Sequence, residues 1–148
     1  MFKTVDGYEP RFDIVTSTFK QDLAFGQEGE QMVLAFLRDL EHGTLEVKYD
    51  RYRNGKIVVE TEHCLGGHWQ LSGLNVTTAK WWVYVFAPHT FMAVQTARLK
   101  KYLRTNQLPK ELFNKHTATP TRGFLLSPAQ VTDLMTSNHY DIGDTSEF

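Results

Sequence analysis

Residues 44–63 read TLEVKYDRYRNGKIVVETEH, and this stretch decides which fold the sequence predicts. Apolar and charged side chains alternate from Thr44 to Asp50 and again from Lys56 to His63, which is the two-residue period of a half-buried strand. Arg53-Asn54-Gly55 lies between them, and Asn and Gly accept the positive φ of a tight turn. The two strands are therefore predicted to pair as an antiparallel hairpin.

The hydrophobic pattern also predicts the register of this hairpin. A three-residue loop at 54–56 places Asp50 opposite Glu60 and Lys48 opposite Glu62, whereas a two-residue loop would set Asp50 against Val59. The longer loop gives one apolar face and one charged face that carries Glu46, Lys48, Asp50, Glu60 and Glu62. Carboxylates this close repel each other unless a cation lies among them, and Mg²⁺ prefers such hard oxygens. The alternative is an ordinary sheet face that points into water.

A helix is predicted upstream, from Gly26 to Glu41. Its apolar stripe recurs at three- and four-residue spacing, at Val33, Leu34, Leu37 and Leu40. Glu30 falls on the same stripe, one turn from the predicted helix start. It either complements the helix dipole there or points into a site.

Downstream, the apolar run Trp81 to Phe86 predicts a central strand buried on both faces. A strand at 91–94, a helix at 97–103, a strand at 124–126 and a helix opened by Ser127-Pro128 follow. The predicted fold class is α/β, a single domain over residues 1–148 with a mixed central β-sheet flanked by helices. Residues 137–148 are expected to be an acidic, frayed tail.

Composition narrows the functional classes. The longest apolar run, residues 81–87, is far short of the ~20 residues that span a bilayer, so no membrane partner is expected. The opening MFKTVDGYEP has no apolar signal-peptide core, so a cytoplasmic location in a phage-infected or prokaryotic cell is expected. The single cysteine, Cys64, excludes an internal disulfide and a cysteine-based zinc cluster.

Charge is unevenly distributed along a chain whose net charge is −1. Between residues 98 and 122, Glu111 is the only acidic residue. The basic residues of that segment are Arg98, Lys100, Lys101, Arg104, Lys110, Lys115 and Arg122. Such a surplus can neutralise the phosphates of a nucleic acid, or it can be a solvated helix face.

A helical glutamate followed by Asp-x9-Glu-x-(Lys or Glu) resembles the PD-(D/E)xK nuclease superfamily, whose fold is that of restriction endonucleases. The matching positions are Glu30, Asp50, Glu60 and Glu62. The segments LEVKYDRYRNGKIVVETE and SGLNVTTAKWWVYVF resemble small phage-type members, and the resemblance covers about residues 26–86.

Two departures from the family pattern leave alternatives open. Glu62 stands where the usual lysine would be, and no proline precedes Asp50. Either Glu62 itself or Lys48 could replace that lysine. A rival assignment takes Glu46-x-Lys48 as the second motif with Asp13 as the first acid.

The resemblance implies a Mg²⁺-dependent DNA endonuclease, with Mn²⁺ as a possible substitute, and structure-specific cleavage of branched or junction DNA is one alternative for its substrate. Asp50, Glu60 and the carbonyl of Thr61 would hold the metal. Lys48 or Glu62 would orient or deprotonate the water, and Glu30 would bind a second metal or its water shell.

The resemblance also implies partners. Arg51, Arg53, Lys100, Lys101 and Arg104 would contact DNA phosphates, and members of the superfamily often act as homodimers. The alternative function is a non-catalytic nucleic-acid-binding or interaction module on the same fold.

Overall fold

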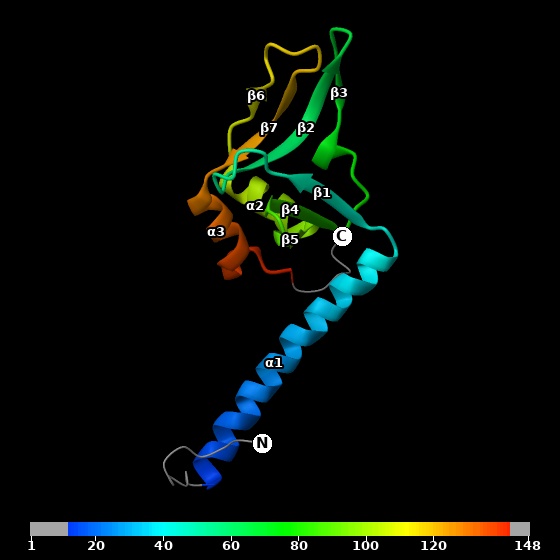
Figure 1. The fold of residues 1–148 in the computed structure, drawn as a ribbon. Coiled ribbons are helices and arrows are strands. Elements are labelled where there is room, and N and C mark those ends of the chain that lie inside the picture. The colour runs from blue at the N-terminus through cyan, green and yellow to red at the C-terminus, as the bar shows by residue number, and fades with distance from the viewer. Residues whose placement is uncertain (1–11, 143–148) are drawn as a thin grey trace. The chain divides into compact units, whose positions relative to one another are not determined.

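A computed structural model describes the backbone of residues 12–142 and the side chains of residues 18–142. The chain divides into two compact units, residues 1–41 and 42–148. Helix α1 (Phe12–Glu41) belongs to the first unit, and all the strands and remaining helices belong to the second (Figure 1). No helix within the described residues is long and apolar enough to cross a membrane.

Helix α1 confirms the predicted helix and extends it toward the N-terminus by more than three turns, to Phe12. Gly43, with φ +69°, follows its C-terminus, where a left-handed residue commonly ends a helix. The stripe that was predicted to be buried is exposed: the exposed fractions of Val33 and Leu37 are 57% and 45%. The spacing is that of an amphipathic helix. However, α1 is the only element that the structure describes within its unit, so no other described element of that unit covers the stripe.

The second unit contains a mixed three-stranded sheet. Its order is β1 (Leu45–Tyr49), β4 (Trp81–Ala87) and β5 (Thr90–Gln95), with β1 parallel to β4 and β4 antiparallel to β5. The apolar run predicted as a central strand is indeed the central strand of this sheet, with Trp82, Val83 and Tyr84 buried.

A second sheet of four antiparallel strands completes the β-structure. Its order is β3 (His68–Leu71), β2 (Ile57–Leu65), β7 (Thr121–Leu126) and β6 (Glu111–Phe113). A short 3₁₀ turn, η1 (Gly73–Asn75), packs against β2. The strands are therefore divided between two sheets.

The predicted hairpin between residues 44–50 and 56–63 is wrong. Its two strands form as β1 and β2 but lie in different sheets, and Glu60 pairs with Gly123 rather than with Asp50. A turn still forms at Asn54-Gly55 without the hairpin, and in it the Asn54 side chain accepts a hydrogen bond from the Lys56 backbone at 3.0 Å. Instead of pairing with each other, β1 pairs with β4 and β2 pairs with β7. These pairings join both strands to the buried apolar core.

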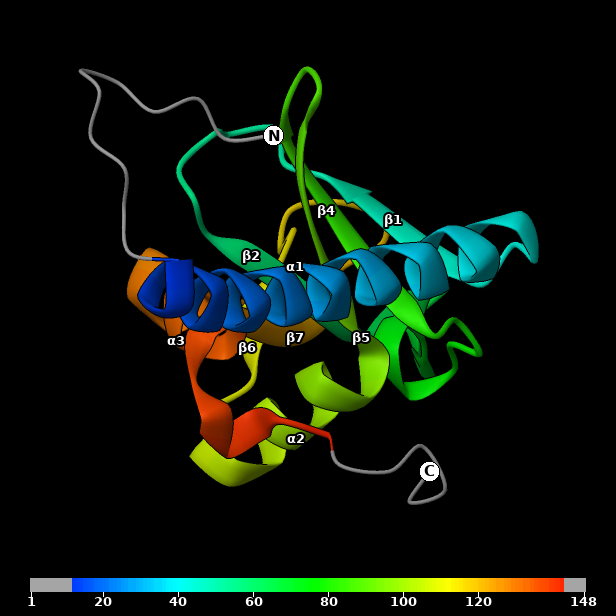
Figure 2. The same cartoon turned by 90° about the horizontal axis from the view of Figure 1, so that it is seen from below.

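Two helices and a short turn complete the second unit: α2 (Thr96–Asn106), α3 (Pro128–Thr136) and the 3₁₀ turn η2 (Asn138–Tyr140). Helix α2 lies beside β5 and helix α3 beside β7 (Figure 2). The predicted Ser127-Pro128 helix start is confirmed, with a full capping box between Ser127 and Gln130. The core contains Ile57, Val59, Trp82, Leu99, Leu126 and Leu134. The α/β class with a mixed sheet and flanking helices is therefore confirmed.

Candidate active site

Strand β1 carries its charged side chains on the inner face of its sheet. In the parallel register Glu46 lies next to Trp82 and Lys48 next to Tyr84, and both aromatic residues are in the buried core. Val47, on the opposite face, is 58% exposed. The charged face is thus half-buried, and the apolar face of β1 points outward.

Lys48 is held in this half-buried position by two neighbours. Its Nζ lies 2.8 Å from Glu46 Oε1 and 5.6 Å from the centroid of the Trp82 ring. Burial raises the pKa of the nearby Tyr84 hydroxyl, and the charge of Glu46 raises it further. Tyr84 therefore stays protonated, and its hydroxyl donates to the Val58 carbonyl on β2 at 3.3 Å.

Asp50 follows directly after β1, and its backbone continues the parallel pairing by donating to the Val85 carbonyl at 2.8 Å. Its Oδ1 accepts a hydrogen bond from the Tyr52 backbone at 2.8 Å. Its Oδ2 is buried and has no hydrogen-bond partner among the described residues. A buried carboxylate oxygen without a donor is unfavourable, and a cation or an ordered water at that atom would remove the penalty.

Glu60 reaches the same region from β2. Its Oε1 accepts a hydrogen bond from Ser72 Oγ at 2.6 Å and lies 3.7 Å from His63 Nδ1. Gly73, with φ +50°, allows the loop to approach closely, because a Cβ at this position would collide with the Glu60 carbonyl oxygen. The loop after β3 therefore sets the orientation of the Glu60 carboxylate.

Lys48, Asp50 and Glu60 line one cavity of about 270 Å³, between the end of β1 and the start of β2. Its wall also includes Arg51 and Lys56. Three of the predicted catalytic residues and Arg51, a predicted DNA contact, thus line one cavity although the hairpin that predicted the meeting of the first three does not form. The packing of the two sheets, and not a hairpin register, places these residues at one cavity.

The structure places Thr61 and Glu62 in other surroundings. The Thr61 carbonyl accepts hydrogen bonds from the Ser72 backbone at 2.9 Å and from Asn75 Nδ2 at 3.1 Å, so both of its acceptor positions are used. Glu62 lies 2.9 Å from Lys110 Nζ and 3.4 Å from Arg122 Nη1. The hydrogen bond from Lys110 is the main cause that lowers the pKa of Glu62. Of the two candidates for the missing lysine, only Lys48 borders the cavity.

The other predicted residues are distributed as follows. Glu30 is exposed on α1, in the first unit, and its approach to Asp50 and Glu60 stays a prediction. The side chain of Asp13, the rival first acid, lies outside the described side chains. Arg53 is exposed in the loop after β1, and Lys101 donates to the Asp141 carbonyl at 3.1 Å. Lys100 and Arg104 border a different cavity.

Asp50 and Glu60 are the two carboxylates that line the cavity, and they are the residues there that could hold a cation. No group of three or more His, Cys, Asp or Glu side chains among the described residues could hold a metal ion. Mg²⁺, however, usually keeps several waters and binds through one or two carboxylates plus substrate phosphates. Asp50, with its partnerless Oδ2, and Glu60 meet that requirement.

Sequence reasoning missed the residues that position the site. Ser72 was not among the predicted site residues, yet its hydroxyl donates a hydrogen bond to the Glu60 carboxylate. The Ser72-Gly73 pair was the available signal, because glycine permits the close approach and serine supplies the donor.

Comparison of the chain with protein-family models, with curated proteins and with solved structures gives no match. The function is therefore inferred from the cavity and from the residues that line it.

Proposed function

We propose that this protein is a divalent-metal-dependent endonuclease that hydrolyses phosphodiester bonds in DNA. The observation that carries the proposal is the cavity shared by Lys48, Asp50 and Glu60. It is joined by a second one, that the buried Asp50 Oδ2 has no donor among the described residues. The resemblance of the surrounding sequence to PD-(D/E)xK nucleases supports the same chemistry.

Asp50 and Glu60 would hold the metal, Mg²⁺ or Mn²⁺. When bound, such an ion lowers the pKa of a coordinated water and neutralises charge that develops on the phosphoryl group. The residues present fit this role because both side chains are carboxylates and each has one oxygen already fixed by a donor, Tyr52 for Asp50 and Ser72 for Glu60.

The chain's own groups supply orientation and charge. The donors on Asp50 Oδ1 and Glu60 Oε1 fix both carboxylates before substrate binds, which lowers the reorganisation needed in the reaction. Lys48, held by Glu46, places a positive charge at the cavity, where it would orient the attacking water or a phosphate oxygen. Arg51 and Lys56 on the cavity wall would contact flanking phosphates.

The test is a cleavage assay with purified protein on supercoiled, linear and four-way-junction DNA, in Mg²⁺, in Mn²⁺ and in EDTA. Cleavage is expected with either metal and not with EDTA. Glu60→Gln should lose both cleavage and Mn²⁺ binding, measured by calorimetry. Lys48→Ala should keep Mn²⁺ binding and lower the cleavage rate roughly 10²–10⁴-fold, because it removes a group that acts in the transition state.

Glu62→Gln is the matched control. It makes the same chemical change on the same strand, two residues after Glu60, and Glu62 does not line the cavity. It should keep cleavage and metal binding. Cleavage that survives Glu60→Gln would contradict the assigned site.

The alternative function is a nucleic-acid-binding module without catalysis. It is favoured by one observation, that no three-ligand metal group exists within the described residues. Salt-dependent DNA binding by a protein that cuts none of the three substrates in either metal would establish this alternative. The predicted homodimer belongs to the proposal as well, and light scattering of the protein with and without DNA would test it.

A further inference from the structure

A second cavity, of about 330 Å³, opens between helix α2 and the four-stranded sheet. Helix α2 contributes Lys100, Leu103 and Arg104, the sheet contributes Thr61 and Phe124, and Lys110 closes the rim. Glu60 borders the candidate active site, whereas Thr61, the next residue of β2, borders this second cavity. The two residues are neighbours at the irregularity of β2 between Glu60 and Glu62, and they border different cavities.

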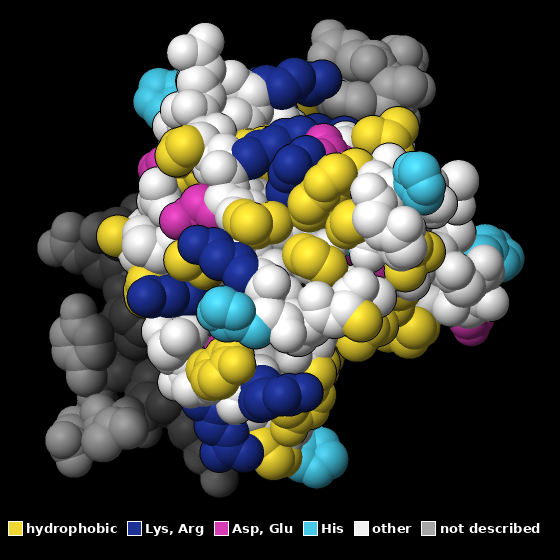
Figure 3. All heavy atoms as spheres, turned by 90° about the horizontal axis from the view of Figure 1, so that it is seen from above, with side chains coloured by type: hydrophobic (Ala, Val, Ile, Leu, Met, Phe, Trp, Pro, Cys, Tyr) yellow, Lys and Arg dark blue, Asp and Glu magenta, His cyan; other side chains and the backbone are white. Residues whose placement is uncertain are grey.

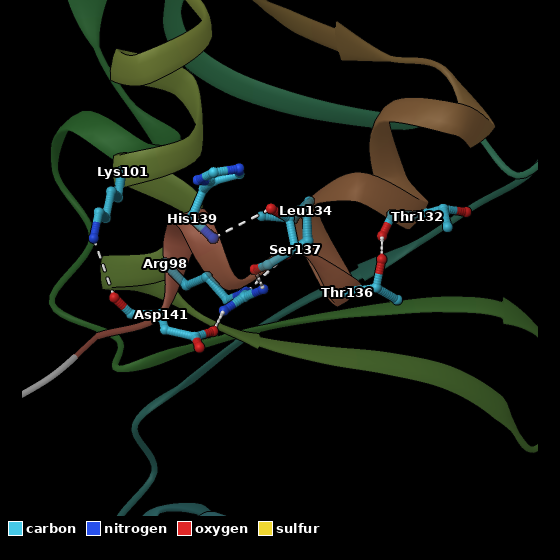
Figure 4. Close-up of polar contacts among 8 residues, drawn as sticks. All are labelled: Arg98, Lys101, Thr132, Leu134, Thr136, Ser137, His139 and Asp141. Carbon is cyan, nitrogen blue, oxygen red and sulfur yellow. Dashed lines mark hydrogen bonds and ion pairs between the residues drawn. The ribbon is translucent and has the colours of Figure 1, made fainter.

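The basic residues of α2 divide into two groups. Arg98 donates to the Leu134 carbonyl at 2.7 Å and the Ser137 carbonyl at 2.6 Å and pairs with Asp141 at 2.7 Å, while Lys101 donates to the Asp141 carbonyl (Figure 4). These two cations tie α2 to the C-terminal segment. The hydrogen-bond donors of Arg98 and Lys101 therefore already have acceptors within the protein.

Lys100 and Arg104 are different, because they lie four residues apart and so share the helix face that borders the cavity. Like charges at this spacing repel each other, and neither side chain has an anionic partner within the described part of the chain. A bound anion would remove this repulsion.

The rest of the rim leaves the cavity positive. Lys110 is the third basic residue of the lining, and no Asp or Glu belongs to the described lining. The Lys110 Nζ lies 2.9 Å from Glu62, whose carboxylate is also 3.4 Å from Arg122, so one carboxylate is shared between two cations. Basic side chains also gather in groups among hydrophobic ones on the face drawn in Figure 3, where acidic side chains are fewer.

The interior of the cavity is apolar. Leu74 and Leu103 are buried, and Phe124 packs against the core. The volume is at the lower end of the ~300–1,000 Å³ typical of small-molecule sites. A ligand that fits has a negatively charged group for the rim and a compact, less polar body for the interior.

We infer that this cavity binds a nucleoside phosphate, either as a free nucleotide or as the phosphorylated end of a DNA strand. The choice of nucleoside phosphates among anionic ligands rests on the proposed function, because each hydrolysed phosphodiester bond in DNA leaves a nucleoside phosphate at one of the two new strand ends. The phosphate lies against Lys100, Arg104 and Lys110, and the nucleoside lies against Phe124 and the leucines.

Calorimetry in EDTA tests the inference on the full-length protein. Deoxyadenosine 5′-monophosphate should bind, and deoxyadenosine should bind roughly tenfold or more weakly, because it lacks the charged group. The double variant Lys100→Gln/Arg104→Gln should lower affinity for the monophosphate by roughly tenfold or more. Lys115→Gln, which removes one exposed charge away from the cavity, is the control and should bind as the wild type does.

The glutamine variants keep the aliphatic stems, and a thermal melt checks that they fold. Octathymidylate with and without a 5′-phosphate distinguishes the two sources of the ligand. A preference for the phosphorylated strand over the monophosphate identifies a strand end, and the reverse identifies a free nucleotide. Equal affinity of wild type and double variant for the monophosphate, or equal affinity for monophosphate and nucleoside, or no binding at all, would overturn the inference.

This experiment separates the second cavity from the active site. EDTA removes any metal-dependent cleavage, and Glu60→Gln should bind the monophosphate as tightly as the wild type does. A protein that cleaves no DNA could therefore still pass the binding test, and an active nuclease could fail it.

Discussion

Gly73 shows at the scale of one residue how the candidate site is held. Its φ of +50° brings the loop against the Glu60 backbone, and the preceding residue, Ser72, hydrogen-bonds the Glu60 carboxylate. Glycine is needed for two reasons here, the left-handed backbone and the absence of a Cβ.

Gly73→Ala is expected to lower the free energy of unfolding by about 2 kcal/mol or more, because the new Cβ must displace the Glu60 carbonyl. Urea denaturation measures this change. Gly66→Ala is the control, since Gly66 also has positive φ (+55°) but open space around it, and it should lose only about 1–2 kcal/mol. Equal losses at the two positions would show that close packing against Glu60 contributes nothing.

Glu62 should make stability depend on pH. The hydrogen bond from Lys110 lowers its pKa below the ordinary value of 4.5, so the folded state binds this proton less readily than the unfolded state does. Its stabilising contribution is complete above pH 4.5 and is lost as the pH falls through the lowered value. The difference in unfolding free energy between wild type and Glu62→Gln should therefore be present at neutral pH and shrink in acid. Urea titrations at several pH values measure it, and a difference that grows in acid would contradict the ion pairing.

Among the elements, helix α2 depends on one arginine for its attachment to the C-terminal segment. Three groups of the Arg98 guanidinium bond the Leu134 carbonyl, the Ser137 carbonyl and the Asp141 carboxylate, and the side chain is only 17% exposed. These bonds also satisfy carbonyls near the C-terminus of α3, which would otherwise lack donors.

Arg98→Met is expected to destabilise the protein by about 1–3 kcal/mol, because it leaves partly buried carbonyls without donors while retaining most of the side-chain volume. Lys101→Met is the matched control and should change stability by less than about 0.5–1 kcal/mol, since Lys101 makes one bond of 3.1 Å at an exposed position. Thermal unfolding of both variants gives the comparison. A small effect of Arg98→Met would mean that water replaces all three bonds.

Over the whole molecule, strand β2 connects the two proposed sites. It belongs to the four-stranded sheet, yet its Glu60 lines the same cavity as Lys48 of β1 and Asp50, which follows β1. Its Thr61 borders the basic cavity beside α2. The net charge of −1 gives no general attraction to DNA, so the proposed phosphate binding would depend on local basic groups such as those of the two cavities.

Several features follow from the sequence alone. The presence of strands β2 and β4, the Ser127-Pro128 helix start and the α/β class were predicted from local patterns, and the structure agrees. Lys48, Asp50 and Glu60 border one cavity, but the hairpin from which their proximity was predicted does not form. These succeed because alternation, capping and glycine chemistry depend on neighbouring residues.

Only the tertiary structure decided which strands pair and which faces are buried. Alternation shows that Glu46, Lys48 and Asp50 share a face of β1, but it does not show whether that face points to water or to the core. That choice depends on which partner buries more apolar surface, and Trp81–Ala87 and Thr121–Leu126 lie too far along the chain for a local pattern to compare them with an adjacent hairpin strand. The hairpin prediction is therefore wrong, although Lys48, Asp50 and Glu60 line one cavity. They do so because β1 and β2 pack against the same core from two different sheets.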